Sequence, residues 1–115
     1  MRRPRKARLK AARTWSAAVF AALGDETRLG LVSRLSEEGP MSIANMTAGS
    51  GITRQAITKH LRVMEEAGVA RGTPHGRETI WQIEQDRLVE ARWYLQLIST
   101  QWDAALTRLK HLVER

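Results

Sequence analysis

The chain has 115 residues, no cysteine and a formal net charge of +7. Its length fits one domain, and the lack of cysteine excludes disulfides and thiolate metal sites. No apolar run approaches the roughly 20 residues that cross a membrane, and the basic N-terminus lacks the apolar stretch of a signal peptide. The sequence therefore predicts a cytoplasmic protein of one domain that has no membrane partner.

The positive charge is concentrated at the N-terminus. Residues 1–13 hold seven of the 19 Lys and Arg and no acid, which leaves 12 basic against 12 acidic residues in the rest of the chain. We expect residues 1–13 to form a disordered basic arm that either attracts phosphate or only keeps the chain in solution. Residues 14–115 are expected to fold, and the placement of charge within them has to indicate the partner.

Two helices are predicted in the first third of the chain. One covers residues 14–23, and the second follows Asp25, whose carboxylate is a favoured N-cap. Leu29, Val32 and Leu35 recur at three-residue steps in this second helix. We expect them to form its buried face.

Two more helices follow, and then the apolar period changes. Ser42 is expected to cap a short third helix, and Thr53 to cap a fourth over 53–67 with Gly68 as its left-handed stop. Beyond that glycine, β-branched and aromatic residues flank a Pro-His-Gly tip, which predicts a β-hairpin over 69–83. Helix, turn, helix and hairpin in this order outline a winged helix-turn-helix.

The helix predicted over 53–67 carries its charges in the order that opposes the helix dipole. Arg54 lies in the first turn, and Glu65 and Glu66 lie in the last, whereas the dipole favours acids first and bases last. A recognition helix in the DNA major groove places its N-terminal residues on base edges, where Arg and Gln suit the bases and an acid repels phosphate. DNA binding therefore explains the order. A solvated amphipathic helix in which Arg62 pairs with Glu66 is the plain alternative.

The outer face of this helix and the hairpin supply the candidate DNA contacts. We expect Arg54 and Gln55 on base edges, a smaller contact from Thr58, and phosphate contacts from Lys59 and Arg77. The complete predicted set is Thr53, Arg54, Gln55, Thr58, Lys59, Arg62, His75 and Arg77.

The opposite face of the helix carries an apolar stripe of Ile57, Leu61 and Met64. His60 lies beside this stripe. Two roles are open for it, a phosphate contact or a half-buried histidine that holds the helix in place.

The segments "VFAALGDETRLGLVSRLSEEGPMSIANM" and "GITRQAITKHLRVMEEAGVARGTPHGRETIWQI" resemble the ArsR-type bacterial transcriptional regulators over about residues 15–90. The resemblance implies a homodimeric winged helix that binds an operator and usually represses. It places residues of this chain at the family's DNA-reading positions and in its wing, namely Arg54, Gln55, Thr58, Lys59 and Arg77. Ser50 departs from the family pattern, which has an apolar residue there, so we expect a more loosely packed turn.

Many members of that family sense metals, but their ligand motifs are broken here. Ser42 and Ala44 stand at the cysteine positions, and Ile98 and Thr100 stand where the last helix of the family has Asp and His. The remaining half motif at 111–114 has too few ligands for tetrahedral zinc. We predict no metal and no cofactor.

We also predict no enzymatic activity, because His and Ser form no spaced catalytic cluster.

Apolar residues recur at steps of three and four through a long last helix, expected over about 86–114 with Asp86 as its cap. Such a helix is about 42 Å long, more than a small body covers, so we expect it to pair with a second copy. Part of the stripe can also pack on its own domain, and Trp15 and Trp93 either join the interface or line a small-molecule cavity. The predicted dimer contacts are Trp15, Leu88, Ala91, Leu95, Ile98, Trp102, Ala105 and Leu109.

The sequence thus predicts a mainly α (α+β) winged helix-turn-helix with a two-stranded β wing and a long C-terminal dimerisation helix. The predicted function is that of a homodimeric repressor on a palindromic site in double-stranded DNA. A winged-helix protein-interaction module that does not bind DNA is the main alternative, and it would carry apolar or acidic residues on the outer face of 53–67. An RNA binder that uses the basic arm is a third, favoured by exposed aromatic residues. An effector, small molecule or protein, stays open.

Overall fold

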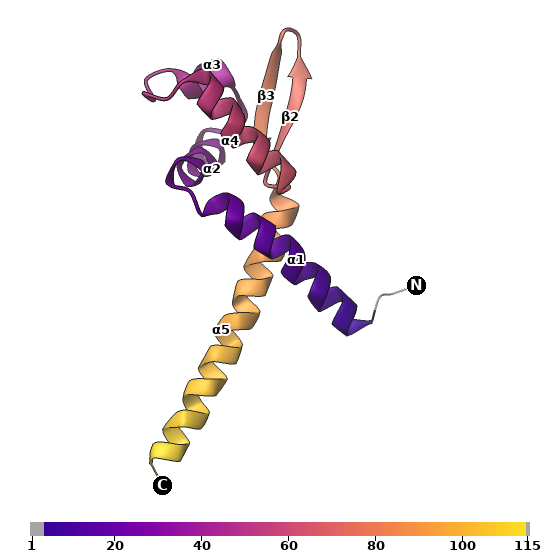
Figure 1. Ribbon diagram of the computed structural model, residues 1–115, viewed down its shortest axis with the longest axis vertical. Coiled ribbons are helices and arrows are strands. Elements are labelled where there is room, and N and C mark those ends of the chain that lie inside the picture. Colours follow the sequence, from indigo (N-terminus) through magenta and orange to yellow (C-terminus); the bar gives the residue numbers. More distant parts are fainter. Residues whose placement is uncertain (1–3, 115) are drawn as a thin grey trace.

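The computed structural model describes residues 4–114 and contains, in that part of the chain, five helices and three strands (Figure 1). In chain order these are α1 (Arg5–Leu23), α2 (Glu26–Glu38), β1 (Met41–Ser42), α3 (Ile43–Thr47), α4 (Arg54–Glu66), β2 (Ala70–His75), β3 (Glu78–Ile83) and α5 (Gln85–Val113). We call α2, α3, α4 and the three strands the head. Below it α1 crosses α5, and α5 continues well past that crossing (Figure 1). The predicted winged helix-turn-helix fold is confirmed.

Side chains cap the three helices of the head as the sequence predicted. Oxygens of Asp25, Ser42 and Thr53 each accept a backbone N–H from the first turn of their own helix, at 3.0, 3.2 and 3.1 Å. Gly68 has a φ of 77°, so it ends α4 in the left-handed region where a glycine is favoured. These local signals place the boundaries of the helix-turn-helix.

The first helix begins much earlier than expected. Residues 5–13 were expected to be a disordered arm but form the first half of α1; residues 1–3 of that arm lie outside the described part. Ala, Leu, Lys and Arg, which make up this stretch, are good helix formers. Ala12 and Ser16 are buried along this helix, which packs against α5. Tertiary packing therefore continues the helix into sequence that charge alone suggested was disordered.

The last helix begins at Gln85, so Asp86 lies in its first turn and is not its cap. Glu84 holds the N-cap position without a side-chain hydrogen bond. Its backbone N–H instead donates to the carbonyl of Val69 at 2.8 Å. This bond ties the end of the hairpin to its beginning, directly before the first residue of α5.

The wing has a strand that the sequence did not predict. The antiparallel sheet has the order β1-β3-β2, with Met41 opposite Trp81 at its short edge. A two-residue strand is too short to show an apolar period, which explains the omission. The tip of the hairpin also lies later than expected: His75 still pairs with Glu78, so the turn falls at residues 76–77.

The core of the head lies under α4. The predicted stripe of Ile57, Leu61 and Met64 is fully buried. In α2 the prediction was partly wrong, because Leu31 and Leu35 are buried, whereas Leu29 is 51% exposed. The inward face of α2 starts with the side chain of Arg28, one turn before Leu31, and this arginine reaches the end of α1 and α4.

The turn between α3 and α4 is closed by Ser50, where we expected looser packing. The Ser50 hydroxyl donates to the carbonyl of Thr47 at 2.8 Å and accepts the N–H of Ile52 at 3.1 Å. These bonds replace the apolar contact that another residue would make.

Among the described helices, none combines the length and the apolar character that crossing a bilayer requires.

Candidate nucleic-acid interface

The outward face of α4 gathers the candidate residues that the sequence placed there. With the apolar stripe buried, the first turns of α4 present polar and basic side chains to solvent. Arg54, Gln55, Lys59 and Arg62 are exposed, and Thr58 is half-buried between them. Neither of the acids, Glu65 and Glu66, comes before the last turn. The arrangement suits a negatively charged partner that approaches the N-terminal half of the helix.

The two threonines of this set already use their hydroxyls within α4. Thr53 accepts the N–H of Ala56, and Thr58 donates its hydroxyl proton to the carbonyl of Arg54 at 2.7 Å. Thr53 still has its hydroxyl proton to donate, whereas Thr58 keeps only an oxygen lone pair and its methyl group for a partner. Thr53 is thus primarily a cap, and Thr58 is left with an accepting or apolar contact.

The arginines of the wing differ in what they touch. Arg71, on β2, lies 3.3 Å from the carboxylate of Glu84 and donates to the amide oxygen of Gln82 when that amide is oriented to accept. Arg77 and His75 are exposed at the tip. Arg71 therefore stabilises the base of the hairpin, while the tip presents Arg77 and His75 outward.

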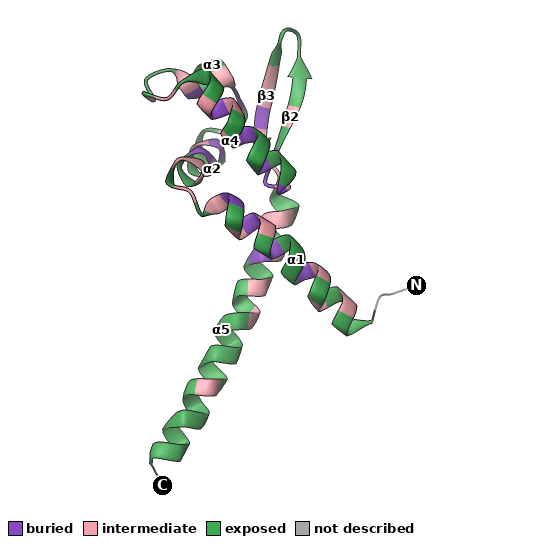
Figure 2. Cartoon of the chain, viewed as in Figure 1, coloured by how far each residue is buried: buried purple, intermediate pink, exposed green. Residues whose placement is uncertain are grey.

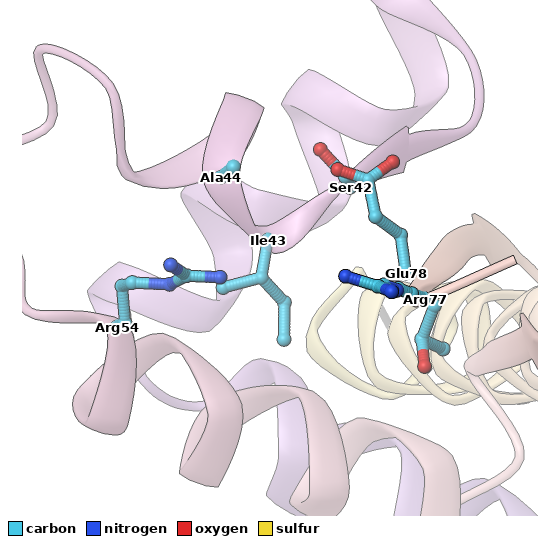
Figure 3. Close-up of a pocket in the computed structure, with 7 residues that line it drawn as sticks. Ser42, Ile43, Ala44, Arg54, Arg77 and Glu78 are labelled. Atoms are coloured by element: carbon cyan, nitrogen blue, oxygen red, sulfur yellow. The ribbon is translucent and has the colours of Figure 1, made fainter.

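The start of α4 and the wing tip meet at one cavity. It measures about 200 Å³ and lies between the start of α3, the start of α4 and the hairpin turn. Figure 3 shows the guanidinium groups of Arg54 and Arg77 pointing toward each other from opposite sides, with Ile43 between them. The carboxylate of Glu78 turns toward Ser42 at the far side. The two arginines lie on separate elements, α4 and the hairpin turn, and no local pattern in the sequence indicates that they converge.

Of its two predicted roles, His60 has that of a half-buried histidine packed between helices. Nδ1 of His60 lies 3.2 Å from a guanidinium nitrogen of Arg28 and 3.9 Å from Oδ2 of Asp25. Arg28 also donates from Nε to the carbonyl of Ala22 at 2.5 Å. The backbone hydrogen bond from Arg28, helped by the charges of Arg28 and His60, lowers the pKa of the Asp25 carboxyl. His60 thus belongs to a cluster that joins α1, α2 and α4, and it holds the helix in place.

Comparison with known proteins gives the family. A family model described as a helix-turn-helix domain matches residues 23–73. The uncharacterized HTH-type transcriptional regulator YuzN of Bacillus subtilis is 39% identical over 52% of this chain and 72% of its own length. An ArsR-like transcriptional regulator from Rhodococcus sp. RHA1 has a TM-score of 0.78 and 29% identity, covering 89% of this chain and 95% of that one. The chain belongs to the ArsR-type family of transcriptional regulators. The arsenical resistance operon repressor of Escherichia coli is 25% identical, over 83% of this chain and 79% of its own.

In this ArsR-type regulator the positions of the family's metal ligands have other tasks. Ser42, at a cysteine position, caps α3. Ile98, at an acid position in α5, is an exposed apolar side chain. Within residues 4–114, no group of three or more His, Asp or Glu side chains lies close enough together to hold a metal ion. Insensitivity to metals stays a prediction.

The long helix of the regulator divides at its crossing with α1. Ala91 is buried and Leu88 packs against the core of its own chain, so the structure uses these two predicted dimer contacts inside the subunit. Trp15, on α1, is 42% exposed, with the guanidinium of Arg87 stacked on its ring at 3.6 Å. Beyond the crossing Figure 2 shows α5 exposed over almost all of its length. We call this part, residues 95–113, the rod.

The rod exposes large apolar side chains at the spacing that the sequence showed. They continue the seam to the end of the helix and include residues on its flank that the prediction of the dimer contacts omitted. These residues are Leu95, Ile98, Trp102, Leu106, Leu109, Leu112 and Val113, each between 45% and 74% exposed. Ala105 is half-buried, and Trp93, 48% exposed, lies outside the seam with its ring edge-on to Tyr94. Leu106 and Val113 each lie four residues after a seam residue, which is the signal that identifies them.

Proposed function

We propose that this chain is a homodimeric repressor that binds a palindromic DNA operator through α4 and the wing. The observation that carries the proposal is the division of its cations. Arg28, Arg34, Arg71 and Arg87 bond to groups of their own chain. Within residues 4–114, no hydrogen bond or ion pair holds the side chains of the basic residues on the outer face of α4 and at the wing tip. These free cations are Arg54, Lys59, Arg62 and Arg77.

An interaction module that never touches DNA would carry a different outer face. A protein interface has a core depleted of charge and enriched in aromatic and aliphatic groups. The exposed face of α4 carries Arg54, Gln55, Lys59 and Arg62 instead. Such a face suits phosphates and base edges, where amide and guanidinium groups make the specific contacts. RNA binding through the basic residues of α1 would need an exposed aromatic ring beside them, and the ring of Trp15 on that helix is already stacked with the guanidinium of Arg87 at 3.6 Å. Trp93 and Trp102 are exposed but lie on α5.

The exposed apolar seam of the rod favours a dimer, and the twofold symmetry of a dimer favours a palindromic operator. An exposed apolar seam of this length is stabilised when a second copy covers it. Two copies related by a twofold axis present two α4 helices in the same way to DNA, and the operator then repeats its half-site with the same symmetry. The proposed interface consists of Trp15, Leu95, Ile98, Trp102, Ala105 and Leu109, extended by Leu106 and Leu112.

Repression is the mode of action that we propose for the bound dimer. The E. coli relative described above is an operon repressor. A dimer on an operator that overlaps a promoter blocks access by occupancy alone, without catalysis. This role requires neither a cofactor nor an enzymatic group, and it places the protein with the chromosome in the cytoplasm.

Replacement of Gln55 by Ala tests the sequence-reading part of the proposal. An operator is first selected from random duplexes with the intact protein, and binding is then titrated on it and on a scrambled duplex at several salt concentrations. We expect the Gln55→Ala variant to lose about 1–3 kcal/mol on the operator and almost nothing on scrambled DNA. Gln96→Ala removes the same amide from α5 and should change neither.

Equal losses on both duplexes would show that Gln55 does not read the sequence. An intact protein that binds no duplex at all would contradict the whole proposal and favour the protein-interaction module.

A further inference from the structure

We infer that Arg54 and Arg77 together hold a single DNA backbone phosphate, in the cavity between the start of α4 and the wing tip. The inference rests on the proposed function and refines it. From the sequence alone we expected Arg54 to read a base edge and Arg77 to bind a phosphate of its own. The structure instead points both guanidinium groups into one space (Figure 3).

The electrostatics of the cavity favour an anion. Two guanidinium groups aimed at each other repel, and within the described part of the chain neither has an acidic partner that would offset this. Arg54 also lies in the first turn of α4, where the helix dipole adds positive potential. Glu78 is the one acid that lines the cavity, so the net charge of its lining is still positive. A phosphate that enters between the arginines turns the repulsion into two charge-assisted contacts.

The size and position of the cavity favour the DNA backbone as the source of that phosphate. About 200 Å³ is below the roughly 300–1,000 Å³ of sites that enclose small molecules. The cavity opens between the recognition helix and the wing, the two elements that flank a groove in the proposed complex. A phosphate held there would fix the wing relative to α4. Arg54 would then set the register of the helix, and base reading would fall to Gln55 and Thr58.

Salt-dependent binding of three variants tests the shared phosphate. Arg54→Ala and Arg77→Ala should each weaken binding about tenfold, equally on the selected operator and on scrambled DNA, since phosphate carries no sequence information. For a dimer, loss of one phosphate contact per subunit makes the slope of log K against log salt shallower by about 1.8. The double variant should reach this value, and each single variant less, because the other arginine still neutralises the phosphate. Arg71→Ala, which removes the same charge from the base of the wing, should leave the slope unchanged.

Two results of this titration would overturn the inference. A slope shallower by about 3.6 in the double variant would mean that the two arginines bind separate phosphates. A loss for Arg54→Ala that is confined to the operator would mean that Arg54 reads a base. In both cases the intact protein would still prefer its operator, so the proposed function would stand; an intact protein without any preference would remove that function instead.

Removing the negative charge from the cavity, in place of a positive one, should give a variant that binds DNA more tightly. Glu78→Gln takes the only acid from the lining and should strengthen binding to both duplexes by about two- to threefold, whereas Glu37→Gln on the exposed side of α2 should not. No gain from Glu78→Gln would place the phosphate outside this cavity and overturn the inference.

Two further measurements distinguish a DNA backbone phosphate from a free phosphate ion as the ligand of the cavity. At matched ionic strength, potassium phosphate should displace DNA no more than potassium chloride does. In NMR spectra of the intact protein, the Nε–H signals of Arg54 and Arg77 should shift on addition of scrambled duplex and not with millimolar inorganic phosphate. Phosphate-specific displacement, or saturable shifts with the free ion, would identify an effector site in place of a backbone clamp.

Discussion

The head and the rod differ in whether their own chain covers their apolar side chains. In the head, Ile57, Leu61 and Met64 are fully covered by the chain's own elements. In the rod, Ile98 is 45% exposed and Trp102 64% exposed, although their spacing is as regular as that of the head (Figure 2). The head can therefore fold on contacts within one chain. The rod would need a partner to reach the same degree of burial, and in the proposed dimer its stability would depend on protein concentration.

A charge placed in the rod should have the largest effect. In an Ile98→Glu variant a carboxylate enters the proposed seam twice per dimer, at a cost of several kcal/mol. We expect sedimentation to show a monomer, and circular dichroism to show that the helices of the head persist. Gln96→Glu adds the same charge on the other face of α5 and should remain dimeric. A folded dimer of the Ile98 variant would mean that the seam serves another purpose.

Removing a buried side chain from the head should lower the free energy of unfolding by the same amount whether or not the chain dimerises. Leu61→Ala removes a fully buried side chain and is expected to destabilise by about 2–5 kcal/mol at every protein concentration. Leu109→Ala makes the same change in the rod, where the loss should shrink once the chain is diluted to monomer. Urea unfolding at two protein concentrations measures both. A concentration-dependent loss for Leu61→Ala would contradict the division into head and rod.

Capping provides a smaller contrast between the two regions. Thr53→Ala removes the bond to the N–H of Ala56 and should cost about 0.5–2 kcal/mol in thermal or chemical unfolding. Thr100, in the rod, bonds only to the carbonyl of Gln96 one turn earlier in the same helix. Thr100→Ala should therefore change stability by far less. If both variants lost the same free energy of unfolding, the hydrogen bond that Thr53 accepts would contribute nothing to the stability of α4.

The smallest expected effect is that of zinc, which should act on neither region. Ser42 in the head and Ile98 in the rod stand at family ligand positions without being able to bind a soft metal. Zinc at micromolar concentration should thus leave operator affinity unchanged, with a chelator titration as its control. Stoichiometric zinc binding accompanied by release of DNA would contradict this prediction.

Much of the head could be predicted because its signals are local. Asp25, Ser42 and Thr53 cap the helices as expected, and Gly68 ends α4. Each of these effects acts within one helical turn or one residue, so a short stretch of sequence contains the whole cause. The buried stripe of α4 follows from a period of the same kind.

The order of the helices and the hairpin, the inward face of α4, the reversed charge of its outer face and the seam of the last helix all follow from the amino-acid pattern. Contacts between distant segments make residues 5–13 helical against α5, add β1 to the wing and bond His60 to Arg28. Such contacts also bury Ala91 but not Ile98, and they bring Arg54 to face Arg77. The reason is range: caps and periods depend on neighbours within a few residues, whereas these contacts join segments that are brought together by the packing of the whole chain.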